Sequence, residues 1–281
     1  MISEPLRLYV EYRLGGAPRY YFSVKEEHLM KLTDEVRKCV AFLAYWDGSQ
    51  YVLLGTAFWI GLRIADTERF VTYVVTAKHL IEKAESKSAD WAVHLRVNFL
   101  DVEAQWIKTD VKEWYSHPNE SNVDVAIAAV HLEGNLDIKF VPSASFATQA
   151  IIRNRGMGVG DEVFLTGLFG RHTGTNKNIP IVRVGNIAAM PEEPIRTLKW
   201  AEEMEGYLIE SRSIGGLSGS PVFVSFETAR EVDDKPNYMV PIYLLGLVHG
   251  HWDIPVSTKD EAVIIDADCA DSAEGSIWGS Q

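Results

Sequence analysis

Cysteine is scarce in this chain of 281 residues, which contains only Cys39 and Cys269. One lies in an apolar run near the start and the other in an acidic segment near the end, which excludes a disulfide framework, and we expect two free thiols. Long apolar runs are absent too: no stretch reaches the length of a membrane span, and residues 1–5 lack the basic start of a secretory leader. We therefore expect a cytoplasmic protein without a membrane partner.

Positive charge is also in short supply. Lysine and arginine total 27 against 39 aspartates and glutamates, which gives a formal net charge of −12. A surface of that sign repels phosphate groups, so we expect no nucleic-acid partner. Hydrophobic residues make up 47% and charged residues 23%, a composition typical of a folded globular protein. The length allows one large domain or two packed lobes.

The first part of the chain, 1–37, predicts a small appendage. Apolar and polar residues alternate over 6–14, turn-forming residues follow at 15–18, and an aromatic run resumes at 19–23. This pattern predicts a β-hairpin. Ser23 and Glu26 then fit a capping box, which predicts a short amphipathic helix after the hairpin.

From about residue 38 the pattern predicts an all-β architecture. Short apolar runs rich in β-branched and aromatic residues alternate with glycine, proline and Asp-Gly breaks. Many short strands favour closed barrels, which remove exposed strand edges. The stretch 229–237 is typical of a polar surface loop. We expect strands at 39–46, 51–60, 70–76, 91–100, 123–130, 162–168, 181–188, 206–211, 220–225 and 243–249.

The segment GGLSGSP, at 215–221, supplies a candidate nucleophile in Ser218. Its small residues allow a tight turn and a close approach to a substrate carbonyl. The backbone N–H groups of Gly216 and Ser218 would then face the developing oxyanion. Such a segment alone is more often only a turn, so Ser218 needs a base and an acid to support this role.

His79 and Asp124 are the candidate base and acid. His79 ends the apolar run 74–79, where a strand stops and a helical turn over 80–84 begins. Asp124 lies among apolar residues, and its burial would be costly unless a group such as an imidazole N–H satisfies it. Alone, His79 would suit a helix start and Asp124 a strand edge. The other histidines are expected mostly at the surface or in loops.

The segments TAKH at 76–79, DVA at 124–126 and GLSGSP at 216–221 resemble the three signature blocks of chymotrypsin-like serine peptidases. The order His, Asp, Ser is also that of this family. The segments GTAF at 55–58 and LGLVHG at 245–250 strengthen the resemblance.

The resemblance implies a fold and an activity. It implies two six-stranded antiparallel β-barrels, at 38–145 and 146–265, with a tail at 266–281. It also implies a serine endopeptidase that cleaves a protein or peptide substrate through an acyl-enzyme. The triad would be His79, Asp124 and Ser218, with an oxyanion hole at Gly216 and Ser218. Such a site needs no metal and no organic cofactor.

The resemblance is greatest to bacterial cytosolic or V8-like members. Leu217 stands where zymogen-activated members carry an aspartate, so that route of activation is closed. Arg212 and His249 occupy the segments that line the family's specificity pocket, and together they could favour an acidic substrate residue. His249 and His251 could alternatively share a metal, but no third ligand block is visible and we assign none.

Two alternatives remain open at the level of sequence. A barrel of this kind can lose catalysis and serve as a peptide or protein binding module, which fold alone does not exclude. The chain could also be a peptidase that stays silent until a regulatory protein partner remodels its oxyanion loop. The N-terminal appendage and Leu217 motivate this second alternative.

Overall fold

The computed structural model describes residues 8–11, 19–22, 34–63, 70–130, 135–196, 203–211, 216–225, 230–232, 235–237 and 242–250. The chain divides into two units, Met1–Asp34 and Glu35–Gln281. In the first unit, β1 (Leu8–Glu11) pairs antiparallel with β2 (Arg19–Phe22), which confirms the predicted hairpin. The helix expected to start near Ser23 lies outside the described residues. Helix α1 (Asp34–Lys38) leads into the strands of the second unit.

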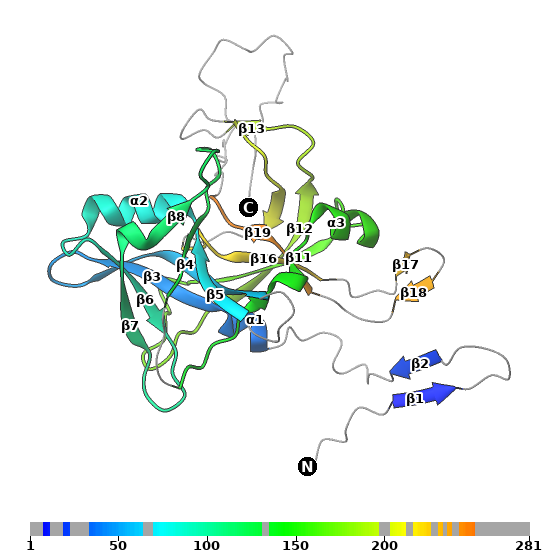
Figure 1. The fold of residues 1–281 in the computed structure, drawn as a ribbon, viewed down its shortest axis with the longest axis horizontal. Helices are drawn as coiled ribbons and strands as arrows, with labels where there is room; N and C mark the ends of the chain where they lie inside the picture. The colour runs from blue at the N-terminus through cyan, green and yellow to red at the C-terminus, as the bar shows by residue number, and fades with distance from the viewer. Residues whose placement is uncertain are drawn as a thin grey trace, which may run out of the picture. The chain divides into compact units, whose positions relative to one another are not determined.

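The first large sheet contains eight strands in the order β7-β6-β3-β4-β5-β9-β8, with β10 pairing parallel to β4 (Figure 1). Helix α2 (Lys78–Lys87) packs against β3, β4 and β6. One 3-10 turn, Val111–Glu113, lies between β7 and β8, and another, Ser143–Ser145, follows β10. The strands are β3 (Val40–Trp46), β4 (Tyr51–Arg63), β5 (Phe70–Thr76), β6 (Ala92–Val97), β7 (Gln105–Asp110), β8 (Trp114–Ser116), β9 (Ala126–Ala128) and β10 (Val141–Pro142).

The apolar sequence of this sheet explains its core. Strand β3 is an almost unbroken apolar run and is buried along nearly its whole length, as a strand covered on both faces must be. Leu80, Ile81 and Ala84 recur on one side of α2 and are buried. They join Trp59 and Val74 in one continuous cluster. The helix predicted over 80–84 is thus confirmed, and it is longer than predicted.

The second large sheet is antiparallel throughout, in the order β15-β12-β11-β16-β19. Its strands are β11 (Glu162–Gly167), β12 (Ile181–Ala189), β15 (Leu208–Ser211), β16 (Pro221–Ser225) and β19 (Ile242–Leu247). Helix α3 (Gln149–Arg155) precedes it, capped by the Thr148 hydroxyl at one end and by Gly156, at φ 62°, at the other.

The all-β class is confirmed, while details of the strands differ from the expectation. The two large sheets have eight and five strands among the described residues, where six each were expected. Strand β7 (sequence QWIKTD) was missed because its largely polar, exposed surface resembles a loop. The predicted loop at 229–237 contains the hairpin β17 (Arg230–Val232) and β18 (Lys235–Asn237). A further pair joins β13 (Ile195–Arg196) to β14 (Glu203–Met204).

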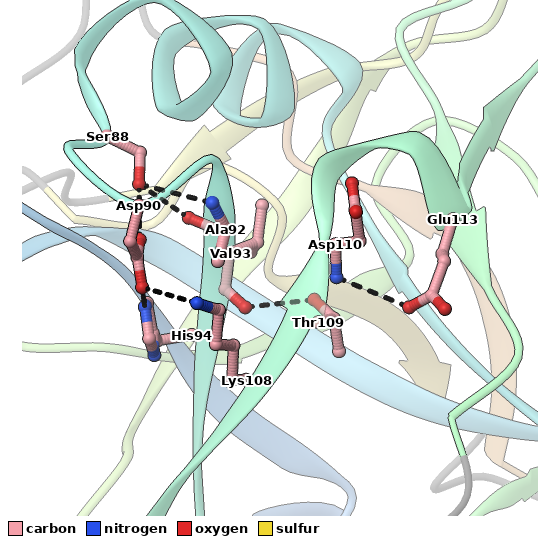
Figure 2. Close-up of polar contacts among 9 residues, drawn as sticks. All are labelled: Ser88, Asp90, Ala92, Val93, His94, Lys108, Thr109, Asp110 and Glu113. Carbon is pink, nitrogen blue, oxygen red and sulfur yellow. Dashed lines mark hydrogen bonds and ion pairs between the residues drawn. The ribbon is translucent and has the colours of Figure 1, made fainter.

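A polar network holds the β6–β7 hairpin, and Figure 2 shows its contacts. The Asp90 carboxylate lies 3.2 Å from His94 Nε2 and 3.0 Å from Lys108 Nζ. Ser88 Oγ donates to Asp90 at 2.8 Å, and Thr109 Oγ1 donates to the carbonyl of Val93 at 2.9 Å. His94 is only 5% exposed, which corrects the expectation that it lies at the surface. Burial lowers the pKa of His94.

Thr56, on β4, joins the two large sheets. Its N–H donates to the carbonyl of Ser218 at 3.0 Å, and its own carbonyl accepts from Thr76 Oγ1 at 2.7 Å. Its hydroxyl accepts from the Leu168 N–H at 2.8 Å and donates to the carbonyl of Gly216 at 3.4 Å. Thr56 is fully buried, so all of its polar atoms need such partners. Together these bonds fix the segment around Ser218 against the first sheet.

The substitution Thr56→Val tests this joint. Valine keeps the shape but leaves the Leu168 N–H and the Gly216 carbonyl without the hydroxyl, so we expect the free energy of unfolding to fall by about 1–3 kcal/mol. The matched control is Thr166→Val, because the buried Thr166 hydroxyl has no hydrogen-bond partner among the described residues. That change should be neutral or stabilising. Urea unfolding followed by tryptophan fluorescence measures both, and equal losses would contradict the assigned role of Thr56.

Candidate functional site

His79 lies in the first turn of α2, immediately after β5 ends at Thr76. The first N–H groups of a helix have no partner within the helix. Ala77, at the N-cap, has no side chain that can supply one. The His79 N–H instead donates to Asp124 Oδ1 at 2.8 Å, so a carboxylate from a distant segment caps this helix.

The register of β9 explains why Asp124 reaches this position. Ala126 pairs with Thr76, which places the residues just before β9 beside the start of α2. There Asp124 Oδ2 lies 2.7 Å from His79 Nδ1 and also contacts His249 Nδ1. The Asp124 side chain is only 10% exposed. A buried carboxylate is thus held by two imidazoles and one backbone N–H, which meets the requirement predicted from its apolar surroundings.

The charge state of Asp124 follows from these contacts. Burial by itself raises the pKa of the Asp124 carboxyl, but the hydrogen bonds from His249 and His79 outweigh burial and hold it below its usual range. The carboxylate is therefore ionised at neutral pH and can only accept hydrogen bonds. It follows that Nδ1 of His79 carries the hydrogen in this pair, and that Nε2 is the basic nitrogen of the neutral ring.

His249 reaches Asp124 through the pairing of β16 with β19. Beyond the last ladder pair, the Val248 N–H donates to the Ser220 carbonyl at 2.9 Å, and the Gly219 N–H donates to the Val248 carbonyl at 2.8 Å. The His79 and His249 rings then meet edge to face, with centroids 5.6 Å apart. Sequence reasoning placed His249 near the substrate but missed its contact with Asp124, because that contact depends on pairing between distant segments.

Ser218 lies in a tight turn that the surrounding backbone defines. The Ser220 N–H donates to the Leu217 carbonyl at 2.8 Å. Since a peptide unit is planar and no cis peptide is present among the described residues, the Ser218 N–H points the opposite way, out of this turn. Leu217 is 5% exposed and packs into the core cluster of the second sheet, which anchors the turn to that sheet.

Gly219 shows why this turn requires glycine. Its φ is +80°, a conformation that residues with a Cβ rarely adopt. A Cβ there would also lie 2.1 Å from the Thr56 carbonyl oxygen and 2.4 Å from Thr76 Oγ1. The approach is therefore close enough to bring the Ser218 turn against residues 76–77, just ahead of His79. Gly216 also has a positive φ, +100°.

Arg212, His251 and Cys269 lie outside the described residues. Cys39 is free, its thiol donates to the Val36 carbonyl, and burial raises its pKa to about 12, which makes it a poor nucleophile. In the part of the chain that the structure describes, no helix is long and apolar enough to cross a membrane.

The same three side chains could also hold a metal ion. His79, Asp124 and His249 each offer one ligand atom, and these atoms lie within 4.8 Å of one another. Two imidazoles and a carboxylate form a ligand set that suits zinc. No metal site was predicted from the sequence. The cluster also differs from the pair of His249 and His251 that the sequence suggested as possible metal ligands.

The pH dependence of stability tests the ionised state of Asp124. Asp124→Asn removes the negative charge and turns one of the two acceptor oxygens into an NH2 donor, so at pH 7 we expect it to lower the free energy of unfolding by about 2 kcal/mol. Because the pKa of Asp124 is depressed on folding, the carboxylate stabilises the fold above its ordinary pKa of about 3.9 and loses this effect as pH falls toward the lower folded value. Urea unfolding at pH 7, 5, 4 and 3 should show the difference in unfolding free energy between the native protein and Asp124→Asn becoming smaller below pH 4. A difference that stays constant with pH would contradict this assignment.

Comparison with known proteins gives little sequence similarity. No protein-family model matches the chain. No curated protein sequence matches it either. Among solved structures the chain is similar to the Drosophila Grass clip serine protease of the Toll pathway, over 78% of this chain and 62% of that chain. The sequence identity is 12% and the TM-score 0.42, and the match spans less than two thirds of that protein's length. A likeness at this level assigns no activity to the chain.

Proposed function

We propose that this chain is a serine endopeptidase with His79, Asp124 and Ser218 as its triad. One observation carries the proposal: an ionised, buried carboxylate holds Nδ1 of His79 at 2.7 Å, and the turn containing Ser218 packs just ahead of that histidine. This fixes the tautomer in which Nε2 is basic, which is what a serine hydroxyl needs for activation. The resemblance of the three sequence segments to chymotrypsin-like peptidases supports the same assignment.

The reaction would run in two halves. His79 Nε2 takes the proton of Ser218 Oγ as that oxygen attacks the scissile carbonyl, and Asp124 stabilises the imidazolium that forms. The imidazolium then gives its proton to the leaving amine, which leaves an acyl-enzyme. A water molecule activated by the same nitrogen hydrolyses the ester and restores the serine.

The oxyanion would be held by the N–H groups of Gly216 and Ser218. The Ser218 N–H points out of the turn because its peptide carbonyl bonds within it. The carbonyl of Gly216 is directed to the Thr56 hydroxyl and so away from the oxyanion. Thr56 thereby helps to keep carbonyl groups out of a position that needs donors.

His249 would act as a positioning residue for the acid. Its Nδ1 contacts the same Asp124 oxygen as His79 Nδ1, and it comes from the opposite sheet. A second donor on this oxygen restricts rotation of the carboxylate and keeps its charge in place beside His79. The contact also engages the nitrogen of His249 that could otherwise have read a substrate side chain.

Covalent labelling tests the triad. A fluorophosphonate probe should add one equivalent to the native protein by intact mass, and Ser218→Ala and His79→Ala should each reduce the labelling rate by at least about a thousandfold, since the serine is not activated without its base. Ser116→Ala, at an exposed strand position, is the matched control and should label normally. No labelling of a well-folded native protein would contradict an armed site, and would favour the binding module or the partner-activated enzyme.

Two substitutions at His249 separate positioning from packing. His249→Asn keeps a donor near the position of Nδ1, whereas His249→Ala removes it. We expect the alanine variant to lose about ten- to a hundredfold in kcat with little change in KM, and the asparagine variant to recover most of that loss. Steady-state cleavage of a peptide library substrate measures both. Equal losses in the two variants would contradict the positioning role.

A further inference from the structure

Arg183 occupies a position where the fold calls for an apolar side chain. Along β12, residues 183, 185 and 187 are buried, while 184, 186 and 188 are exposed. Arg183 is only 9% exposed, whereas its neighbour Val184 is 54% exposed. Successive side chains of a strand point to opposite faces, so the arginine faces the core and the valine faces solvent. This is the reverse of the arrangement expected for a half-buried strand.

The two terminal nitrogens of the Arg183 guanidinium lack a hydrogen-bond partner there. Neither Nη1 nor Nη2 has a hydrogen-bond partner among the described residues, and burial lowers the pKa of Arg183 without any opposing charge. Arg96 shows how this chain satisfies a buried arginine. It is equally buried, and its guanidinium donates to the carbonyls of Thr173, Gly174 and Thr175. An unpaired buried cation is costly, so Arg183 requires an explanation other than packing.

The strand register places Arg183 at the sheet end next to the Ser218 turn. Gly185 pairs with Ser211, the last residue of β15, so Arg183 lies just beyond the end of that strand, in the row that continues through Leu165 on β11 to Val222 on β16, the strand after the Ser218 turn. On its other side Arg183 pairs with Leu165. Paired residues share a sheet face, and Leu165 belongs to the same buried cluster as Leu217, the residue before Ser218.

We infer that Arg183 recognises an acidic side chain of the peptide that Ser218 attacks, pairing with its carboxylate. This inference rests on the proposed function. A guanidinium binds a carboxylate through two parallel hydrogen bonds, and such a pair is strong where water is excluded. A substrate that carries an amide in place of the acid leaves the cation unpaired and is rejected. Arg183 then supplies the positive charge for an acidic substrate residue, a role that the sequence had suggested for Arg212 and His249.

Binding to an inactive protein tests the inference without catalysis. In Ser218→Ala protein, 50 mM N-acetylglutamate should raise Tm by at least about 2 °C at constant ionic strength, because a ligand of the folded state stabilises it. N-acetylglutamine should not. Adding Arg183→Met should abolish the response, and Arg183→Lys, which keeps the charge but not the paired donors, should weaken it. An equal response to both ligands, or one that survives Arg183→Met, would overturn the inference.

Stability without ligand gives a second readout, with Arg96→Met as the matched control. Replacing an unpaired buried cation by an apolar residue should leave Tm unchanged or raise it. Replacing Arg96 leaves three carbonyls without a donor, so the Tm of Arg96→Met should fall while its response to N-acetylglutamate remains. If Arg183→Met lowers Tm as much as Arg96→Met does, Arg183 has a partner within the chain and the inference is wrong.

Cleavage separates this inference from the proposed function. The native protein should cleave library peptides containing glutamate at least about tenfold faster than their glutamine analogues, and Arg183→Met should remove that ratio. Cleavage with no acidic preference would overturn the role of Arg183 and leave the peptidase intact. An Arg183-dependent N-acetylglutamate response in a protein that cleaves no peptide would retain the anion site and reject the peptidase.

Discussion

The hydrogen bond from the Thr56 N–H to the Ser218 carbonyl is the constraint on which the rest of the site depends. It crosses from the first sheet to the second at the turn that contains the candidate nucleophile. The Thr56 hydroxyl and carbonyl extend the link to Leu168, Gly216 and Thr76, so one fully buried residue ties three segments of the chain together. Because Thr56 is fully buried and cannot replace these partners with water, the two sheets have little freedom to slide past each other.

Asp124 is a second buried polar residue that links the two sheets, and it carries a charge. Asp124 precedes β9 and His79 follows β5, both strands of the first sheet, while His249 follows β19 of the second sheet, so the position of the acid is set from both sheets at once. Its depressed pKa is a consequence of these donors and not of exposure. The polar contacts between the two halves contribute less to stability than apolar packing would, but they fix the orientation of the His79 imidazole.

Much of this could be predicted from the sequence where the signal is local. The strand Phe70–Thr76 was placed to the residue, because it is an apolar run ended by a helix start. Strand β7 was missed because four of its six side chains are polar and only one is fully buried. The contact of His249 with Asp124 could not be predicted, since the two residues are 125 positions apart in the chain and meet only through the pairing of β16 with β19. The burial of Arg183 could have been predicted, because side chains alternate between the two faces of a strand and Arg183 lies four residues before Ile187, on the same core-facing side.

The buried charged side chains of this chain differ in how well their polar atoms are hydrogen-bonded. Asp124 receives donors from two imidazoles and a backbone amide, and Arg96 donates to three carbonyls. Arg183 differs from both, because its Nη1 and Nη2 have no hydrogen-bond partner among the described residues. A folded protein that carries an uncompensated cation in its core is less stable than it could be, and an incoming carboxylate regains that stability on binding. For the acidic substrate inferred above, this cost to the free protein would be the source of discrimination, because a neutral side chain at the same place would leave the guanidinium unpaired.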